Sequence, residues 1–341
     1  MWLNHSTRTN IDLLAASSVR ERTPMRRLPV VLVLLGSLAV AAPVAAAPDA
    51  HLIATIDVAQ NPTGVGFAAR SVWATLDATQ VARIDPATNQ VTATIPVGNF
   101  PVRALGAYNG VWVSNCGDGT VSRINPATNT VVATIPTGNC PFDLGALAGS
   151  VWVVNADNHV SRIDPATNTV IATIHAPLAL CPDPFCFDFR GLGTGAGAVW
   201  VTSHRSSVLR IDPATNRITG AVRVGPCCFS LRGVAVGFGS VWASVDGLGN
   251  LIIRIDPYTL KITARIRSVQ INPGEIVVFA GRVWFGHDFD PTSIIEAIDP
   301  ATNRTTAAVE VGDFAGSVAA GAGSVWTNSY NAKAVYRISP Q

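Results

Sequence analysis

Five charged residues occupy equivalent points of this 341-residue chain, each nine or ten residues before a tryptophan. They are Arg103, Asp143, Arg190, Arg232 and Glu275. Thr63 and Ser317 occupy two further points of the same kind. Because guanidinium groups form paired hydrogen bonds with carboxylates and phosphates, the pattern predicts a site where arginines hold a small anionic ligand. The alternative is structural: Asp143 and Glu275 would pair with the arginines in a hydrated salt-bridge network.

Two histidines follow tryptophans closely, His204 after Trp200 and His287 after Trp284. We expect them near the charged residues, as polar neighbours or, in an enzyme, as a general base. His287 also precedes Asp288 and Asp290, and one imidazole with two carboxylates could bind Mg²⁺ or Ca²⁺. The alternative is a solvated turn, because the glycine spacing of a calcium loop is missing.

Six cysteines indicate disulfide bonds if the chain is exported. They are Cys116, Cys140, Cys181, Cys186, Cys227 and Cys228. We predict a bond between Cys116 and Cys140, with the other four pairing among themselves, and all six on the face that carries the arginines. Cys227 and Cys228 should have different partners, because a bond between neighbours strains the backbone. Without a Cys-x-x-Cys spacing, a structural zinc site is disfavoured.

A tryptophan repeat must position these side chains. The tryptophans lie 39 to 48 residues apart, each in one copy of the same unit of short segments with alternating polarity. They are Trp73, Trp112, Trp152, Trp200, Trp242, Trp284 and Trp326. A period of about 40 to 45 residues with several strands is typical of a β-propeller with four strands per blade. We therefore predict an all-β, seven-bladed propeller over residues 51–341, with the tryptophans packed between blades.

The two ends of the repeat region complement each other. The final unit stops at Gln341 after its third predicted strand, while residues 52–58 match the outermost, fourth strands of other units. We therefore expect the N-terminal strand to complete the last blade, which leaves the ring without an open seam.

A recurring turn, Ile-Asp-Pro-Ala-Thr-Asn, indicates the hairpin between third and fourth strands. The Asp of this motif is residue 85, 164, 212 or 299, and Asn125 takes its place in one further copy. Asp accepts backbone N–H groups, Pro sets φ, and Asn tolerates a left-handed backbone at the exit.

The N-terminal sequence is typical of a targeting segment. Residues 25–47 have a basic start, an apolar run and a small-residue end near Ala46 or Ala47, which together predict a cleaved signal peptide. Residues 1–24 then form a start-site extension or a disordered segment. An uncleaved membrane anchor is the alternative, although Pro29 and Pro43 interrupt the run. We expect a secreted protein, or a periplasmic or cell-envelope one, with no membrane span after cleavage.

The unit from Val111 to Gly138 resembles the YVTN-type β-propeller repeat of secreted bacterial proteins. It is similar, more distantly, to virginiamycin B (streptogramin B) lyases. That resemblance implies a seven-bladed propeller in which a histidine base and a magnesium ion held by glutamate open a cyclic depsipeptide. Here the third position after each tryptophan carries no glutamate, and inner strands open with Arg190-Gly191 and Arg232-Gly233 where the lyases have His-Gly. Only His287 matches a catalytic candidate.

The amino-acid composition restricts the classes of function that the chain could have. A net charge of +2 and only 13% charged residues, without a basic run, exclude a nucleic-acid-binding surface. We predict a binding module, monomeric and non-enzymatic, for a small anionic ligand or an extracellular protein partner. The alternative is a lyase-like enzyme, or a lactone-opening hydrolase, with a His base and a divalent ion.

Overall fold

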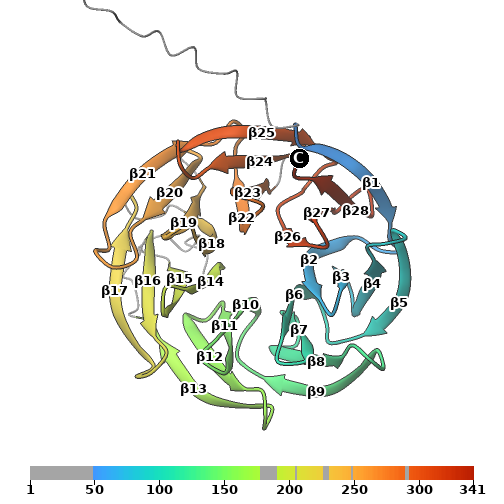
Figure 1. The fold of residues 1–341 in the computed structure, drawn as a ribbon. Helices are drawn as coiled ribbons and strands as arrows, with labels where there is room; N and C mark the ends of the chain where they lie inside the picture. The colour runs from blue at the N-terminus through green and yellow to red at the C-terminus, as the bar shows by residue number, and fades with distance from the viewer. Residues whose placement is uncertain (1–48, 177–189, 204–205, 226–229, 247–248, 289–291) are drawn as a thin grey trace, which may run out of the picture. The chain divides into compact units, whose positions relative to one another are not determined.

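The computed structural model describes residues 49–176, 190–203, 206–225, 230–246, 249–288 and 292–341, which belong to one compact unit. Within these ranges, 28 strands form seven antiparallel four-stranded sheets, arranged as blades around a central axis (Figure 1). The predicted all-β, seven-bladed propeller is confirmed. Over the same ranges, no helix long and apolar enough to cross a bilayer is found.

The first three blades follow the chain from the axis outward. Blade 1 contains β2 (Pro62–Ala68), β3 (Ser71–Leu76), β4 (Gln80–Asp85) and β5 (Gln90–Pro96). Blade 2 contains β6 (Pro101–Ala107), β7 (Gly110–Asn115), β8 (Thr120–Asn125) and β9 (Thr130–Pro136). Blade 3 contains β10 (Pro141–Leu147), β11 (Ser150–Asn155), β12 (His159–Asp164) and β13 (Thr169–His175).

The remaining blades repeat this order. Blade 4 contains β14 (Leu192–Gly195), β15 (Ala198–Ser203), β16 (Ser207–Asp212) and β17 (Arg217–Arg223). Blade 5 contains β18 (Leu231–Gly237), β19 (Ser240–Val245), β20 (Leu251–Ile255) and β21 (Ile262–Arg267). Blade 6 contains β22 (Pro273–Phe279), β23 (Arg282–His287), β24 (Ile294–Asp299) and β25 (Arg304–Glu310). Blade 7 contains β26 (Val318–Gly321), β27 (Ser324–Ser329), β28 (Ala334–Ser339) and β1 (His51–Asp57).

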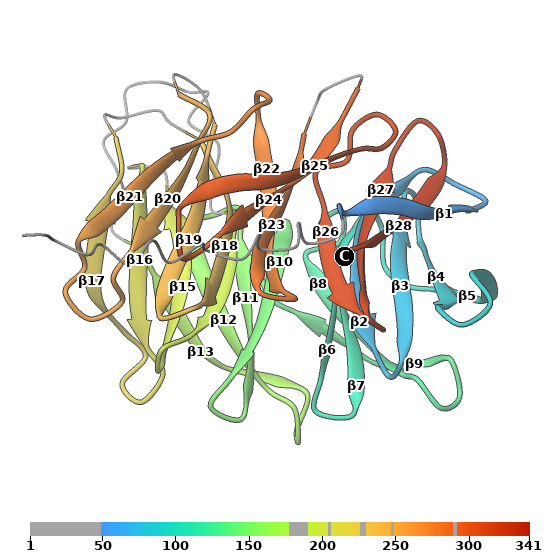
Figure 2. The same ribbon diagram turned by 45° about the horizontal axis from the view of Figure 1, so that its top comes forward.

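The N-terminal strand closes the ring as predicted. β1 pairs antiparallel with β28, from His51 opposite Ser339 to Asp57 opposite Ala334, and both lie in blade 7 (Figure 2). Ile56 of β1 is buried and packs in one cluster with Val65 of blade 1 and Val335 of blade 7. The first strand is therefore part of the core as well as of the sheet.

The tryptophans pack between blades, as their fixed place in the repeat predicted. All seven have no exposed surface. Trp200 of blade 4, for example, packs with Val241 and Ile253 of blade 5, and Trp326 of blade 7 packs with Val72 of blade 1. Each such cluster joins two neighbouring sheets, so the hydrophobic core consists of seven inter-blade layers.

An arginine of the third strand adds a polar link between most neighbouring blades. Arg123 lies over the ring of Trp112 in its own blade, and its Nη1 donates to the Pro165 carbonyl at 2.6 Å and to Asn168 Oδ1 at 2.7 Å in the next blade. We call this pair of bonds the inter-blade arginine contact. The same contact is made by Arg83, Arg162, Arg254 and Arg337.

The turn that receives this arginine has the predicted chemistry. Asp164 Oδ1 accepts the Ala166 N–H at 3.0 Å, and Asn168 has a φ of 55°. In blade 5 the equivalent of the Asn is Leu260, which keeps the left-handed φ of 57° but offers no acceptor. Arg210 of blade 4 instead donates to Thr219 of its own blade at 2.7 Å. The Asn therefore serves both the turn and the neighbouring blade.

Candidate functional site

The predicted charged residues do lie at the starts of the innermost strands, beside the axis. Several of these strands begin with a β-bulge, a local register shift that redirects side chains. Register shifts occur between Pro101 and Arg103 in β6 and between Pro273 and Ile276 in β22. The bulges therefore position Arg103 and Glu275 where the inner strands meet the loops. We call this side, which carries the links between blades, the loop face.

A hydroxyl group of the second strand holds the backbone at each of several inner-strand starts. Ser114 Oγ accepts the Arg103 N–H at 3.1 Å and donates to the Phe142 carbonyl of the next blade at 2.9 Å. Ser244 does the same for Gly233 and Gly274. Sequence reasoning missed this support, although a small hydroxyl residue two positions after the tryptophan was the available signal.

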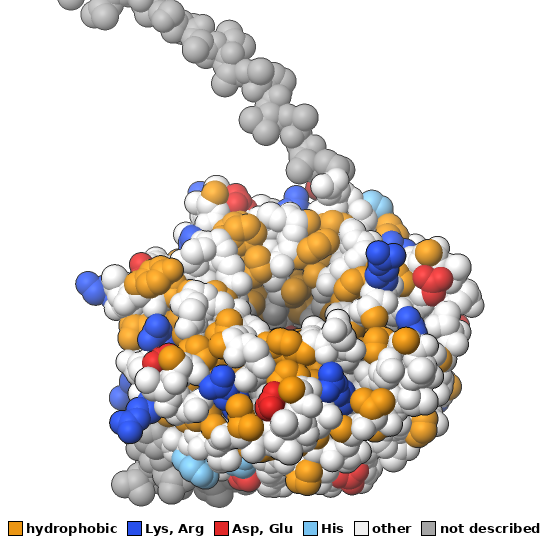
Figure 3. All heavy atoms as spheres, turned by 60° about the horizontal axis from the view of Figure 1, so that its bottom comes forward, with side chains coloured by type: hydrophobic (Ala, Val, Ile, Leu, Met, Phe, Trp, Pro, Cys, Tyr) orange, Lys and Arg blue, Asp and Glu red, His pale blue; other side chains and the backbone are white. Residues whose placement is uncertain are grey.

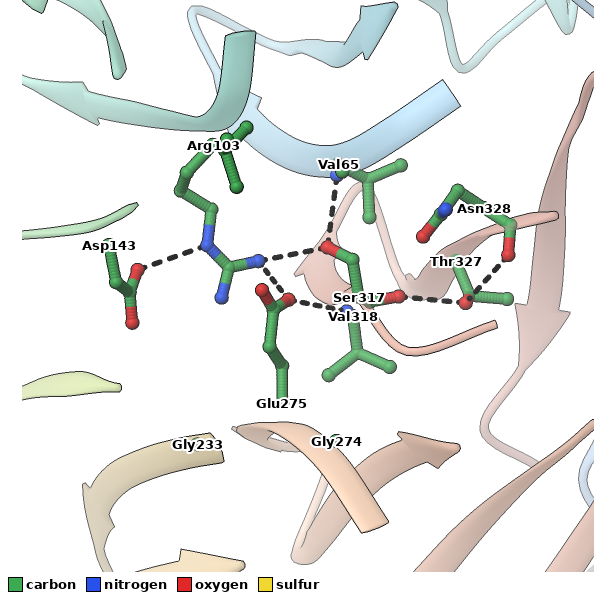
Figure 4. A network of polar contacts seen from close by, with 12 residues as sticks. Val65, Arg103, Asp143, Gly233, Gly274, Glu275, Ser317, Val318, Thr327 and Asn328 are labelled. Atoms are coloured by element: carbon green, nitrogen blue, oxygen red, sulfur yellow. Dashed lines mark hydrogen bonds and ion pairs between the residues drawn. The ribbon is translucent and has the colours of Figure 1, made fainter. Parts of the chain in front are cut away.

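Arg103 is the centre of a polar network that crosses the axis (Figure 4). Its Nε donates to Asp143 Oδ1 at 3.0 Å, and its Nη1 contacts Glu275 Oε2 and Ser317 Oγ, the latter at 2.9 Å. Asp143 Oδ2 accepts the Leu192 N–H at 2.8 Å. We call Arg103, Asp143, Glu275 and Ser317 the axial network. Ser317 Oγ also accepts the Val65 N–H at 3.1 Å, so the network joins blades 1, 2, 3, 4, 6 and 7. Asp143 and Glu275 thus pair with Arg103, as the structural alternative expected.

Burial perturbs the titration of this network. Burial raises the pKa of Glu275 to about 7, against the lowering effect of Arg103, and the nearby carboxylates of Asp143 and Asp288 raise it further. Burial lowers the pKa of Arg103, but Glu275 and Asp143 more than compensate, and the net shift is upward. Arg103 therefore stays charged, while Glu275 changes charge near neutral pH.

A cavity of about 390 Å³ opens above the axial network on the loop face. Its walls include Arg190, Arg232, Glu275 and Asp288, together with a set of apolar and aromatic side chains. The apolar set is Pro62, Phe100, Val102, Phe142, Phe314 and Tyr330. We call this space the loop-face cavity. Sequence reasoning missed the aromatic walls, although a Phe within about three residues of several inner-strand starts was a readable signal.

A second cavity, of about 250 Å³, lies further along the axis. Inner-strand side chains such as Val65, Leu144 and Val234 line it, together with Arg103 and Asp143. A hollow with hydrophobic side chains at its rim marks the centre of one face of the ring (Figure 3). Because Glu275 and Ser317 line the loop-face cavity while Arg103 and Asp143 line this one, the axial network separates the two spaces.

The five predicted ligand residues thus divide into two groups. Arg103 and Asp143 belong to the interior of the axial network, whereas Arg190, Arg232 and Glu275 line the loop-face cavity. The Arg190 guanidinium lies 5.0 Å from the ring centre of Phe142. Arg103 and Asp143 therefore lie below the floor of the loop-face cavity, where they line the second cavity.

Arg232 is held by two carboxylates that the sequence did not assign to it. Its Nη2 lies 3.1 Å from Asp246 Oδ2 and its Nη1 lies 2.9 Å from Asp288 Oδ2. Asp288 in turn lies against the backbone of Gly316, where a Cβ would collide with the carboxylate. The glycine therefore allows blade 7 to approach the Arg232–Asp288 pair.

His287 is not placed to act as a catalytic base, because its imidazole is fully buried inside blade 6. Nε2 lies 3.0 Å from Glu296 Oε1, and Nδ1 lies 2.8 Å from the Ile271 carbonyl oxygen. In blade 2 the equivalent pair is Asn115 and Ser122, joined at 2.9 Å. His287 and Glu296 are therefore the blade 6 version of a structural pair, which comparison of the repeats could have revealed.

Glu296 is the buried acid that the sequence analysis missed. Burial raises its pKa, but hydrogen bonds from His287 and Ser268 outweigh burial and the net shift is downward. Its Oε1 also accepts the Val269 N–H at 2.9 Å. The carboxylate therefore anchors the link between blades 5 and 6.

The predicted metal set lies only partly within the described residues, and its two described members have other partners. His287 contacts Glu296, whereas Asp288, at the bend that follows β23, contacts Arg232 at the cavity. Over the described ranges, no group of three His, Cys, Asp or Glu side chains is placed to hold a metal ion. Asp290 and His204 lie outside the described residues.

The disulfide between Cys116 and Cys140 is present as predicted. Cys116 follows β7 and Cys140 precedes β10, so the bond joins blade 2 to the link between blades 2 and 3 on the loop face. The other four cysteines, Cys181, Cys186, Cys227 and Cys228, lie outside the described residues, as do the predicted signal peptide and residues 1–24.

Comparison with known proteins supports the fold alone. No protein-family model and no curated protein sequence matches this chain. Among solved structures, the chain is similar to hydrazine synthase of Kuenenia stuttgartiensis. The two share a TM-score of 0.71 and 14% sequence identity, over 82% of this chain and 96% of that one. At this identity the likeness shows a shared propeller architecture, and a propeller fold does not specify a function.

Proposed function

We propose that this protein is an exported binding module that holds a small ligand with an acidic group in the loop-face cavity. The observation that carries the proposal is the composition of that cavity, in which Arg190 and Arg232 stand beside aromatic walls in a space of about 390 Å³. Ligand sites are typically apolar hollows of this size with a few convergent polar groups. A hollow enclosed by several blades suits a small molecule better than the surface of a protein partner.

Export is supported by the disulfide on the loop face, because such bonds persist in oxidising compartments. The same bond restrains a blade link beside Phe142, one of the cavity walls. The resemblance of the repeat to secreted YVTN-type propellers points in the same direction. The proposed site is thus a rigid surface of an exported protein.

The test uses benzoate, with neutral benzamide as the matched control. Benzoate should raise the melting temperature of the wild-type protein, and benzamide should not. The double variant Arg190→Ala/Arg232→Ala should remain folded and lose the benzoate effect, while Arg265→Ala on the exposed face of β21 should keep it. Equal stabilisation of the double variant, or no effect of benzoate on the wild type, would refute an acid-binding cavity.

A lyase-like enzyme is the second candidate, favoured by one observation. Glu275 lines the cavity and has a pKa of about 7, which suits a general base at neutral pH. In this enzyme, Glu275 would act as the general base, the role that the similarity to virginiamycin B lyases gives to a histidine. Ring opening of a cyclic depsipeptide by the wild type, lost in Glu275→Gln, would favour the enzyme.

A further inference from the structure

The loop-face cavity has two chemically different halves. Blades 4, 5 and 6 contribute the charged side chains, namely Arg190, Arg232, Glu275 and Asp288. Blades 1, 2, 3 and 7 and their links contribute apolar and aromatic walls, among them Phe100, Phe142 and Phe314, together with uncharged polar side chains. These polar side chains are Thr63, Ser317, Asn328 and Asn331. A ligand that fills this space should therefore be amphipathic, with its charged groups gathered at one end.

The charged half carries both signs close together. Two arginines face two acidic residues, and the Arg232 guanidinium lies 2.9 Å from the Asp288 carboxylate. With Glu275 ionised, the formal charges of these four residues cancel. A purely anionic head can still pair with the arginines, but it should bind more weakly, because its negative charge stays unbalanced in a partly desolvated space and it competes with Asp288 for Arg232. A head with both charges avoids both costs.

The carboxylates have room for such a partner. The side chains of Glu275 and Asp288 keep 21% and 31% of their surface exposed, compared with 13% for Arg232. Both carboxylates are therefore more accessible than Arg232. An ammonium group placed there would meet two carboxylates, while a carboxylate one or two bonds away would reach the arginines.

We propose that the ligand is a zwitterion with a free amino group and a carboxylate on one end and a large apolar side chain on the other, that is, an apolar or aromatic amino acid. This inference rests on the proposed function and specifies its ligand class. Arg190 and Arg232 hold the carboxylate, Glu275 and Asp288 hold the ammonium, and Phe142 and Phe314 cover the side chain.

Isothermal titration with three probes tests the assignment. L-Phenylalanine should bind, and N-acetyl-L-phenylalanine and L-phenylalanine amide, which each lack one charge, should bind at least about tenfold more weakly, since one charge-assisted contact is lost. Equal binding of the N-acetyl compound would overturn the zwitterion but leave an acid-binding cavity intact. Equal binding of the amide, or binding of none of the three, would overturn both.

A variant separates ligand contact from a structural role. Asp288→Asn should weaken phenylalanine binding about tenfold, because one carboxylate no longer meets the ammonium. The same change releases Arg232 from an ion pair, so binding of the N-acetyl compound should stay equal or become tighter. Asp57→Asn on the exposed face of β1 is the control and should change neither. If Asp288→Asn weakens both probes equally, the carboxylate only shapes the cavity and the assignment is wrong.

Discussion

Arg103 shows how one side chain can connect distant parts of a ring. It begins on blade 2, yet its ion pairs reach Asp143 on blade 3 and Glu275 on blade 6, on the other side of the axis. Removing one partner of such a group would leave a buried charge uncompensated, which is costly. The three residues therefore act as one unit, and Glu275 is the member whose charge changes near neutral pH.

The first prediction concerns pH. The pKa of Glu275 is about 7 in the folded protein and about 4.5 in an unfolded chain. Between these two pH values the folded state keeps a proton that the unfolded chain has released. Its contribution to stability is therefore fully present below about pH 4.5 and is lost as the pH rises through 7. Relative to Glu275→Gln, the wild type should lose up to about 3 kcal/mol of unfolding free energy over this window.

Urea unfolding at a series of pH values measures this difference. Glu310→Gln, on the exposed side of β25, serves as the control and should run parallel to the wild type. If the wild-type and Glu275→Gln profiles also run parallel, Glu275 has the same pKa in the folded and unfolded states and the upward shift is refuted.

At the scale of elements, two kinds of contact stabilise most junctions between neighbouring blades, one apolar and one polar. The tryptophan supplies hydrophobic burial between sheets, and the inter-blade arginine contact ties the same sheet to the turn of its neighbour. Blades 4 and 6 depart from this scheme: Arg210 stays within its blade, and Arg282 takes over in blade 6, with its Nη1 3.3 Å from the Pro340 carbonyl. The junctions should therefore differ in strength.

A double-mutant cycle on Arg123 and Asn168 tests the polar layer. Arg123→Met should lose about 1–3 kcal/mol of unfolding free energy. Asn168→Gly removes the acceptor while permitting the left-handed backbone, and the two changes should couple by about 1 kcal/mol. Arg210→Met should cost less than Arg123→Met, because its bond lies within one blade. Simple additivity of the Arg123 and Asn168 changes would show that the bond between these two side chains contributes nothing.

The spacing of the tryptophans was enough to predict the elements and their order. It located the inner-strand starts, and Asp, Pro and Asn identified the turns, because each of these depends on local geometry. The sequence offered Asp143 and Glu275 as partners of the arginines, but it could not assign them to Arg103, because the pairing depends on distances across the axis. The partners of Arg232, Asp246 and Asp288, were not predicted, because they come from links between strands. His287 was misjudged from its residue type, whereas its repeat position matched the buried Asn115.

At the scale of the whole molecule, stability depends on a strand that comes from the other end of the propeller. β1 supplies the outermost strand of blade 7 and contributes Ile56 to the core cluster between blades 7 and 1. The other side of β1 remains exposed, and Ile53 on that side keeps 46% of its surface accessible to solvent. Substitution of Ile56 therefore tests whether β1 packs against the core, and substitution of Ile53 is the control on the exposed side of the same strand.

The last prediction uses this pair. Ile56→Ala should reduce the free energy of unfolding by about 2–5 kcal/mol, the range for a buried isoleucine truncated to alanine. Ile53→Ala, on the same strand, should remain within about 0.5 kcal/mol of the wild type. Equal effects of the two changes in denaturant unfolding would show that β1 is not packed against the ring.

The pairing of His51 with Ser339 also fixes when the ring can close. These two strands are the first and last of the propeller to leave the ribosome, so β1 has no partner while the intervening blades are being made. Closure must therefore follow synthesis.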